Sequence, residues 1–278
     1  MGVSTLLGKH GGSYAEHPYH RSMEKIKLVV LTGASRGLGL AMAEALIDSG
    51  HQMLCVSRGQ SSSLQQRAAA RGTTLEQWSM DLAQGGAVAT RLKSWMAAQD
   101  GRRLAVASLI NNAAALARIG PLSQADGEDL TQALRVGLEA PMLLTAAFLL
   151  GSEAWTGSDS ISRRVLNISS GLGRRAMASQ AGYCAVKAGI DHFTRCLALD
   201  EARKPHGARV CSLAPGVIDT DMQLQLRAAA GVEFPDRANF VGLKEKGLLT
   251  SPADAARQVL AYLARSDFGS QPIGDVRD

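Results

Sequence analysis

Short apolar runs alternate with longer periodic stretches along most of the chain. Apolar runs of strand length occupy 27–31, 52–57, 74–80, 104–110, 165–168 and 209–213. Stretches with the spacing of helices cover 40–49, 61–71, 86–99, 127–150 and 181–203. Strands that alternate with helices predict an α/β fold, with a doubly wound parallel sheet, helices on both faces and right-handed crossovers.

The first residues stand apart from this pattern. Residues 1–22 are rich in Gly, Ser, His and Tyr, show no periodicity, and lack the apolar core of a signal peptide. The strand pattern begins after Met23, and neither repeats nor a linker divide the rest of the chain. We therefore predict a disordered tail over 1–22 and a single domain over 23–278.

Composition and charge exclude several classes of function. The chain has 278 residues, 46% of them hydrophobic, as in an ordinary soluble globular protein. Its net charge of +5 is scattered, without a run of Lys and Arg, so no nucleic-acid partner is expected. The longest apolar stretch, Ala140 to Leu150, is too short to span a bilayer, so no membrane partner is expected. The cysteines lack metal-ligand spacing and no secretory signal precedes them, which predicts reduced thiols, no metal and a cytoplasmic location.

The strongest chemical signal is a tyrosine and a lysine one helical turn apart. Tyr183 and Lys187 share one face of the predicted helix 181–203, and Ser170 lies thirteen residues before Tyr183. A free tyrosine has a pKa of about 10, and a nearby cation lowers that pKa by favouring the phenolate. The pair is a candidate acid–base device, although a helix can also carry Tyr and Lys at this spacing by coincidence.

A glycine-rich turn is the second signal. The apolar run 27–31 leads into Thr32-Gly33-Ala34-Ser35-Arg36-Gly37-Leu38-Gly39 and then into the helical pattern of 40–49. Such a turn lets the backbone approach a pyrophosphate, whose charge the helix N-terminus favours. Turns without ligands also need glycine, but the strand–turn–helix context favours dinucleotide binding. Both signals fall at the carboxyl ends of predicted strands or on the helix that follows, where parallel sheets bind ligands.

These motifs, in this order, resemble the short-chain dehydrogenase/reductase family over residues 24–278. The family's glycine motif matches 32–39, its Asn-Asn-Ala-Gly matches 111–114, and its Pro-Gly matches Pro215-Gly216. Its catalytic Ser, Tyr and Lys match Ser170, Tyr183 and Lys187. The resemblance implies a single-domain Rossmann-type fold and a homodimer or homotetramer. It implies cofactor contacts from Gly33, Ser35, Arg36, Gly37, Leu38, Gly39, Arg58, Asp81, Leu82, Asn112, Ala113, Ala114, Tyr183, Lys187, Pro215, Gly216, Val217, Ile218 and Thr220.

The end of the second predicted strand bears on the choice of cofactor. An acidic residue there would bind the ribose hydroxyls and repel a 2′-phosphate, but the chain has Ser57-Arg58. Arg36, in the glycine turn, is expected near the same ribose, and two guanidinium groups suit a phosphate dianion. Unless both are ordinary surface arginines, the sequence favours NADPH over NADH.

One residue departs from the family pattern. The family's Asn on the helix after the fourth strand is replaced by Gly137. Pro141 has no amide hydrogen, so it cannot bond the carbonyl of Gly137 four residues earlier. A water on that free carbonyl could pass a proton between Lys187 and solvent, and this backbone relay is our hypothesis. The alternative is that Gly137 marks a weakened or lost activity.

Local strings favour one branch of the family. Tyr183-Cys184-Ala185, the segment 214–223 and the C-terminal acidic residues look like those of sepiapterin and benzil reductases. Asp275 matches in position the Asp that anchors the pterin in sepiapterin reductases, although it could equally be a solvated tail residue. Residues 217–247 are expected to cover the substrate, with apolar contacts available from Met222, Leu224, Leu226, Phe234 and Phe240. The candidate substrate residues are Ser170, Met222 and Asp275.

The sequence therefore predicts an NADPH-dependent carbonyl reductase that transfers hydride to a small ketone or dicarbonyl, sepiapterin-like or benzil-like. Tyr183 is expected to be the general acid and Ser170, with Ser169 as its near rival, to hold the carbonyl oxygen. Lys187 is expected to lower the tyrosine pKa and to anchor the nicotinamide ribose. An NADP-dependent alcohol dehydrogenase and a non-catalytic NADPH-binding regulator are the alternatives.

Overall fold

The computed structural model describes residues 1–2, 25–155 and 161–278. The predicted tail over 1–22 lies almost wholly outside the described residues, so the tail and the domain boundary stay predictions. Within the described residues, parallel strands form one seven-stranded sheet in the order β3-β2-β1-β4-β5-β6-β7. The strands are β1 (Ile26–Thr32), β2 (Gln52–Ser57), β3 (Leu75–Ser79), β4 (Leu104–Asn111), β5 (Ser162–Ile168), β6 (Arg209–Ala214) and β7 (Ile273–Asp275).

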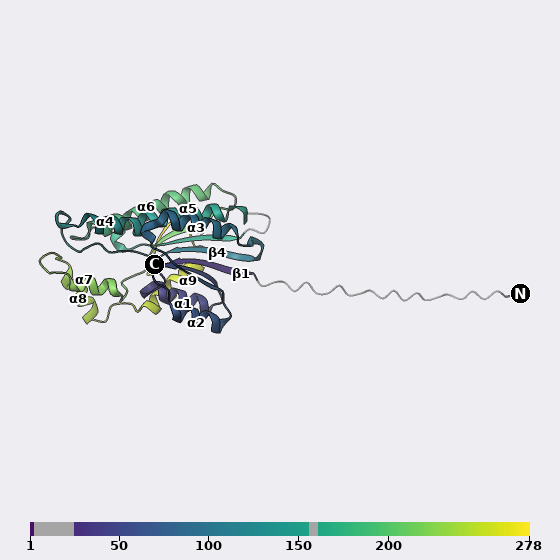
Figure 1. Cartoon of the computed structure of the whole chain (residues 1–278), viewed down its shortest axis with the longest axis horizontal. Coiled ribbons are helices and arrows are strands. Elements are labelled where there is room, and N and C mark those ends of the chain that lie inside the picture. The colour runs from purple at the N-terminus through teal and green to yellow at the C-terminus, as the bar shows by residue number, and fades with distance from the viewer. Residues whose placement is uncertain (3–24, 156–160) are drawn as a thin grey trace.

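Helices cover both faces of the sheet, which confirms the predicted doubly wound α/β fold (Figure 1). On one face α1 packs against α2 and α9, and on the other α3 packs against α5. The helices are α1 (Gly37–Asp48), α2 (Ser62–Arg71), α3 (Gly85–Ala97), α4 (Gly127–Leu134), α5 (Ala140–Gly151), α6 (Ala181–Ala202), α7 (Asp221–Ala228), α8 (Arg237–Glu245) and α9 (Pro252–Ala264). Short 3₁₀ turns are η1 (Leu82–Gln84), η2 (Gly101–Arg103), η3 (Leu122–Gln124), η5 (Glu153–Trp155) and η6 (Gly171–Gly173).

The order of the strands creates a crevice between β1 and β4. The chain builds outward from β1 to β3 and then returns to place β4 on the other side of β1. The loops that leave the carboxyl ends of β1 and β4 therefore run in opposite directions. Open α/β sheets bind their ligands at such a switch point, so the topology places a site where the glycine turn follows β1.

The core consists of two apolar clusters, one on each face of the sheet. Strand β1 contributes to both, because Val29 and Leu31 point to one face and Leu28 and Val30 to the other. Each of these four side chains is at most 2% exposed. Burial on both faces explains why the strands are continuous apolar runs in the sequence instead of alternating patterns.

The C-terminal part contains elements that the sequence analysis missed. Helix α9 begins at Pro252, one residue after Ser251, whose hydroxyl accepts the amide hydrogen of Asp254 at 3.1 Å. Strand β7 is only three residues long and is defined by its pairing with β6, which gives no apolar run to detect. Helices α7 and α8 occupy the segment 217–247 that was expected to cover the substrate.

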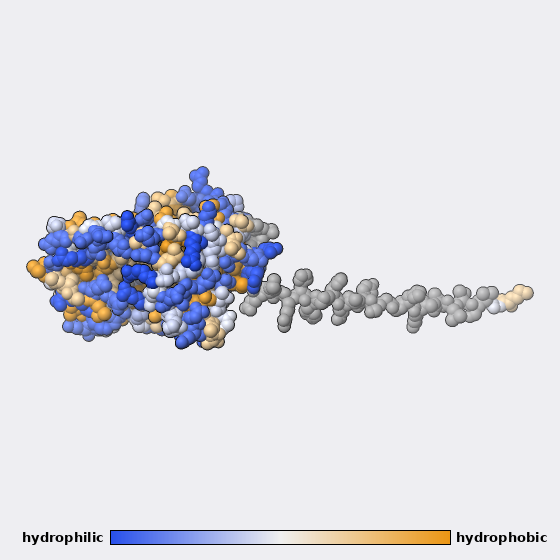
Figure 2. Space-filling model, viewed as in Figure 1, coloured by the Kyte–Doolittle hydropathy of each residue, from blue (hydrophilic) through white to orange (hydrophobic). Residues whose placement is uncertain are grey.

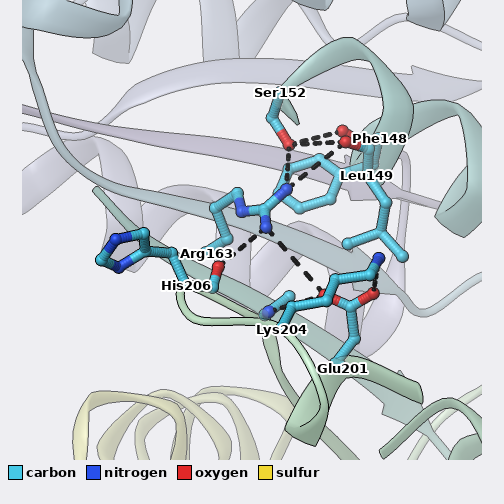
Figure 3. A network of polar contacts seen from close by, with 8 residues as sticks. Phe148, Leu149, Ser152, Arg163, Glu201, Lys204 and His206 are labelled. Carbon is cyan, nitrogen blue, oxygen red and sulfur yellow. Dashed lines mark hydrogen bonds and ion pairs between the residues drawn. The ribbon is translucent and has the colours of Figure 1, made fainter. Parts of the chain in front are cut away.

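Strand β5 begins three residues before its predicted start, because a buried arginine made its first residues look like a polar loop. Arg163 is 5% exposed, and its guanidinium donates to the carbonyl of His206 at 2.9 Å and lies 4.0 Å from Glu201 (Figure 3). The Glu201 carboxylate also accepts from Lys204 at 2.6 Å and from the amide of Ala208 at 2.8 Å. This network lies where β5 and β6 begin, at the opposite end of the sheet from the glycine turn.

The predicted helix 127–150 contains a wider turn in its middle. Between α4 and α5 the chain forms the π-helical turn η4 (Arg135–Glu139), in which the amide of Ala140 bonds the carbonyl of Arg135. Pro141 follows directly, and its missing amide hydrogen interrupts the ordinary helical ladder. Gly127–Gly151 is long and apolar enough to cross a membrane, but in this structure it packs against α3 and α6.

Candidate active site

A cleft runs along the carboxyl ends of the strands. It consists of two adjoining cavities, which we call the first cavity, of about 430 Å³, and the second cavity, of about 350 Å³. All the predicted cofactor residues line one cavity or the other. The walls that the two cavities share are Leu38, Asn112, Ala114, Leu116, Thr220 and Met222.

The glycine turn leaves no room for side chains beside the first cavity. Gly33 and Gly37 have φ angles of +72° and +56°, in the left-handed region that favours glycine. A Cβ on Gly39 would lie 2.1 Å from the carbonyl oxygen of Gly33. Helix α1 begins at Gly37, so its unpaired amides and the positive end of its dipole lie at the cavity wall. This arrangement suits the phosphates of a dinucleotide.

Asn112 fastens the glycine turn to the end of β4. Its side-chain amide donates to the carbonyls of Thr32 at 3.0 Å and Gly33 at 3.3 Å. The Thr32 hydroxyl accepts the backbone amides of Asn112 at 3.0 Å and Ala113 at 3.1 Å. These bonds fix the distance between the two loops at the switch point, a structural role for Asn112 that the sequence analysis did not predict.

Two arginines line the first cavity near the end of β2. Arg58 follows Ser57, the last residue of β2, and both line the first cavity together with Arg36. The Arg36 guanidinium donates to the carboxylate of Asp221, at the start of α7, at 2.9 Å. This donor set fits a dinucleotide that carries a ribose phosphate. The Arg36–Asp221 pair connects the turn to α7, and the sequence analysis missed it because the two residues are 185 positions apart.

Ser170, Tyr183 and Lys187 meet in the second cavity. The Ser170 hydroxyl accepts the amide hydrogen of Leu172 at 3.2 Å and lies close to the Tyr183 phenol, whose pKa it acts to lower. The Lys187 ammonium donates to the carbonyl of Ile168 at 2.7 Å and lies 5.6 Å from the centre of the Tyr183 ring. Helix α6 places Tyr183 and Lys187 on one face, as the four-residue spacing predicted.

Ser169, the rival of Ser170, lines the same cavity but is differently placed. It is 3% exposed, and its hydroxyl has no hydrogen-bond partner among the residues that the structure describes. Ser170, and not Ser169, acts on the pKa of Tyr183, which agrees with the preference for Ser170 from its spacing.

Burial changes the protonation of the tyrosine and the lysine. It raises the pKa of Tyr183 to about 12, an effect that the neighbouring Ser170 only partly opposes. It lowers the pKa of Lys187 to about 8, because the charged ammonium is costly inside the protein. Burial of the phenol is thus the dominant effect on the pKa of Tyr183, and the contribution expected from Lys187 stays a prediction.

A buried carboxylate lies one helical turn beyond Lys187. Asp191 is 1% exposed and accepts hydrogen bonds from Ser212 at 2.7 Å and Arg174 at 3.1 Å. Its charge acts against the burial that lowers the pKa of Lys187. Gly173 lets this layer pack closely, because a Cβ there would lie 2.8 Å from the Lys187 carbonyl oxygen. The sequence analysis missed Asp191, although an acid four residues after the lysine is a signal it could have used.

Gly137 packs directly against the residue before Lys187. It is buried in η4, and a Cβ there would lie 2.6 Å from Cγ1 of Val186. The absence of a side chain thus lets the helix of α4 and α5 approach α6 beside Lys187. The water relay through the Gly137 carbonyl stays a hypothesis.

The structure separates the three predicted substrate residues. Ser170 and Met222 line the second cavity, but Asp275 is not among the residues that line it. The Asp275 carboxylate is 7% exposed and binds the Arg277 guanidinium at 2.7 and 2.6 Å. Arg277, which the sequence analysis did not consider, lines the cavity in its place.

The apolar residues of the expected cover divide in the same way. Leu226 and Phe240 line the second cavity. Phe234 is fully buried behind them, with its ring 5.5 Å from that of Phe240. Leu224 is 58% exposed and does not line either cavity.

Comparisons with known proteins agree with this geometry. The family model of the short chain dehydrogenases matches residues 27–231. Benzil reductase ((S)-benzoin forming) of Bacillus cereus is 32% identical over 251 residues, which cover 90% of this chain and 98% of that protein. Sepiapterin reductase of Rattus norvegicus is 30% identical over 258 residues, which cover 90% of this chain and 95% of that protein.

A solved structure shares the fold. The metagenomic short-chain oxidoreductase in complex with NADP has a TM-score of 0.67 and 25% identity, and the match covers 91% of this chain and 96% of that one. The family model spans most of the chain, and the relatives align over nearly their whole length. The chain therefore belongs to the short chain dehydrogenase family, in the branch of the benzil and sepiapterin reductases, and is an oxidoreductase that acts on CH–OH or C=O groups.

Proposed function

We propose that the protein is an NADPH-dependent carbonyl reductase that acts on a small ketone or dicarbonyl. The observation that carries the proposal is the meeting of Ser170, Tyr183 and Lys187 in the second cavity, beside a first cavity built from the glycine turn and two arginines. The benzil and sepiapterin reductases among the relatives support a carbonyl substrate. The NADP bound to the solved relative supports the choice of cofactor.

Tyr183 is suited to the role of general acid. Because burial raises its pKa to about 12, its phenol keeps its proton at neutral pH and can give it to a carbonyl oxygen that gains negative charge. The Ser170 hydroxyl, which lines the same cavity, can donate to the same oxygen and hold it in place. The nicotinamide cofactor, when bound, supplies the hydride for the carbonyl carbon. General acid catalysis of this kind contributes roughly 10²–10⁴-fold in rate.

Lys187 supports the tyrosine after its proton has left. Its ammonium is 5.6 Å from the ring centre, where a positive charge stabilises the phenolate that remains. The bond to the Ile168 carbonyl fixes the direction of the ammonium, and Asp191 keeps it charged against the effect of burial. We propose that the same ammonium anchors the ribose next to the nicotinamide.

The first alternative is an NADP-dependent alcohol dehydrogenase, in which Tyr183 would act as the base in its phenolate form. The reductases among the relatives support reduction instead. The second alternative, a regulator without activity, was suggested by Gly137. Its packing against Val186 gives that glycine a structural reason that does not require a loss of catalysis.

The proposal is tested by NADPH oxidation with a small panel of carbonyl compounds. Benzil, sepiapterin, an aliphatic 1,2-dione and an aromatic aldehyde are each offered with NADPH and with NADH. Tyr183→Phe is the test variant and Tyr262→Phe is its control, since Tyr262 lines neither cavity. Turnover that prefers NADPH and is lost in Tyr183→Phe alone supports the proposal. Tight NADPH binding by the wild type without turnover of any of the four carbonyls would instead favour the regulator.

We also propose a homodimer or homotetramer in the cytoplasm. Apolar side chains on α4, α5 and α6 support the assembly, since Leu134, Met142, Leu150 and Leu199 are 37–71% exposed. Light scattering of the purified protein measures its mass directly. A monomer at micromolar concentration would contradict the assembly.

A further inference from the structure

The second cavity has cationic walls. Its charged residues are Arg175, Lys187 and Arg277, and within the described residues neither Asp nor Glu lines it. Lys187 is bound to the Ile168 carbonyl, and Arg277 is paired with Asp275. Arg175 is exposed, and its side chain has no hydrogen bond or ion pair within the described parts of the chain. A cleft lined by one sign of charge raises the local concentration of the opposite ion.

Arg175 lies in the segment that carries the reacting groups. It follows Ser170 by five residues and precedes Tyr183 by eight. Its backbone is fixed, because its amide donates to the carbonyl of Gly171 at 3.1 Å and the neighbouring Arg174 binds Asp191. A free guanidinium on a fixed backbone is well suited to bind an anionic group. Since one cavity contains both Arg175 and Tyr183, one small molecule can contact both.

A second donor in the same wall has no acceptor. Gln180, the residue before α6, is 4% exposed and lines the second cavity. Its side-chain Nε2 has no hydrogen-bond partner within the described residues. A buried donor without an acceptor is costly, and an oxygen of a ligand would offset that cost. Because α6 begins at Ala181, the positive end of its dipole lies beside the same position.

The wall also has an apolar part. Among the side chains that form it are Leu116, Met177, Met222, Leu226 and Phe240. In Figure 2, hydrophobic residues also show at the end of the molecule where Figure 1 places α7 and α8, the helices that supply three of these five. The ligand that matches the cavity therefore has an apolar body and an anionic end.

The carboxylate that pairs with Arg277 does not reverse this preference. Both oxygens of Asp275 are engaged by the Arg277 guanidinium, which holds the pKa of Asp275 below its usual range. A cationic ligand would have to displace Arg277 to reach that carboxylate.

We propose that the preferred substrate is an aromatic or branched 2-oxo acid, whose carboxylate binds Arg175 while its keto group faces Ser170 and Tyr183. The keto carbon accepts a hydride from NADPH and the keto oxygen accepts the proton of Tyr183. The C=O bond becomes a C–O single bond, one C–H and one O–H bond form, and the products are a 2-hydroxy acid and NADP⁺. This inference rests on the proposed reductase function and deepens it by naming the charge of the substrate.

Benzoylformate and its methyl ester separate the two claims. Both carry the same aryl ketone, and only benzoylformate carries a negative charge. We expect Arg175→Gln to lower kcat/KM for benzoylformate about tenfold more than for the ester, mainly through KM. Arg103→Gln is the matched control, since it removes the same charge at the start of β4, far from both cavities. Arg103→Gln should leave the ratio of kcat/KM for benzoylformate to kcat/KM for the ester unchanged.

Each result has a distinct meaning. An equal loss for both substrates in Arg175→Gln, or turnover of the ester with no turnover of benzoylformate, overturns the inference and leaves the reductase function standing. If the wild type reduces neither, the reductase function is in doubt, and calorimetry of benzoylformate with the NADPH-loaded protein decides the inference. Binding that Arg175→Gln weakens about tenfold supports an anion site at Arg175, and no binding by the wild type overturns it.

Discussion

A side chain at position 137 should strain the packing beside the catalytic lysine. In Gly137→Ala the new Cβ lies 2.6 Å from Cγ1 of Val186, whereas carbon atoms pack best at about 3.5–4.0 Å. Val186 is 3% exposed and β-branched, so its methyl groups cannot rotate away freely. Overpacking of this kind costs about 1–3 kcal/mol, against a gain of about 0.5–1 kcal/mol when alanine replaces glycine in a helix. We therefore expect a net loss of about 1–2 kcal/mol in the free energy of unfolding.

A second substitution tests whether contact with Val186 causes this loss of stability. Val186→Ala removes the methyl groups that the new Cβ would strike and costs about 2 kcal/mol by itself, for lost burial and a small cavity. In that background Gly137→Ala should cost nothing or be slightly stabilising, so the double mutant is about 1–3 kcal/mol more stable than additivity predicts. Urea denaturation of the four proteins measures this coupling through the midpoint at constant slope. Additive effects, or a stabilised Gly137→Ala single mutant, would refute the packing argument.

The same background gives a fair test of the backbone relay. Gly137→Asn alone would change both the proton relay and the packing against Val186. The Asn of the family should therefore be introduced at position 137 in the Val186→Ala variant. If the Gly137 carbonyl already serves the relay, the rate of carbonyl reduction changes little. A gain on the order of a hundredfold, the size of a lost proton-transfer contribution, would sink the relay hypothesis.

Four further predictions concern charge. Asp191→Asn removes an interaction that raises the pKa of Lys187, so that pKa should fall below about 8 and the alkaline loss of reductase rate should move to lower pH. The pKa of Lys187 is 10.5 in the unfolded chain and about 8 in the folded one, so the unfolded chain binds more protons between pH 8 and 10.5. The free energy of unfolding of the wild type, relative to that of Lys187→Met, should therefore rise with pH across this window. Urea titrations at several pH values measure it. Arg58→Asp should lower kcat/KM with NADPH at least about tenfold and raise it with NADH, since the carboxylate repels a 2′-phosphate and binds ribose hydroxyls; equal effects on both cofactors would contradict the assignment. Glu201→Ala should lower the free energy of unfolding by about 3–5 kcal/mol, because it leaves the buried Arg163 without its anionic partner. The KM for NADPH should stay within about twofold of the wild-type value.

The parts of the fold that the sequence predicted are those in which one local rule decides the structure. Strands such as β1 and β2 are buried on both faces, so each is an apolar run with a definite start and end. The glycine turn could be predicted equally well. Its left-handed φ angles and the close approach of Gly39 to Gly33 favour glycine over almost every other residue.

The parts that the sequence did not predict depend on partners far along the chain. Arg163 appeared to belong to a loop, because its burial is made possible by Glu201 and by the carbonyl of His206. Strand β7 is defined by its pairing with β6, and a segment of three residues has no sequence pattern from which that pairing can be predicted.

The candidate site follows the same division. The positions of Ser170, Tyr183 and Lys187 were predicted from spacing and resemblance, but the effect of burial on the pKa of Tyr183 was not. Spacing indicates that an ammonium is near a phenol, whereas the pKa depends on how deeply the phenol is buried, which only the packing of α6 reveals. Arg277 likewise escaped notice, since its place in the cavity wall depends on β7.

The central claim is that Tyr183 donates the proton in an NADPH-dependent reduction. One preparation each of wild type and Tyr183→Phe should be measured for NADPH binding and for benzil-dependent NADPH oxidation, with the alcohol product quantified. The account predicts that both proteins bind NADPH with similar Kd, that the wild type forms one alcohol for each NADPH consumed, and that Tyr183→Phe is slower by roughly 10²-fold or more. Equal rates for the two proteins would contradict it.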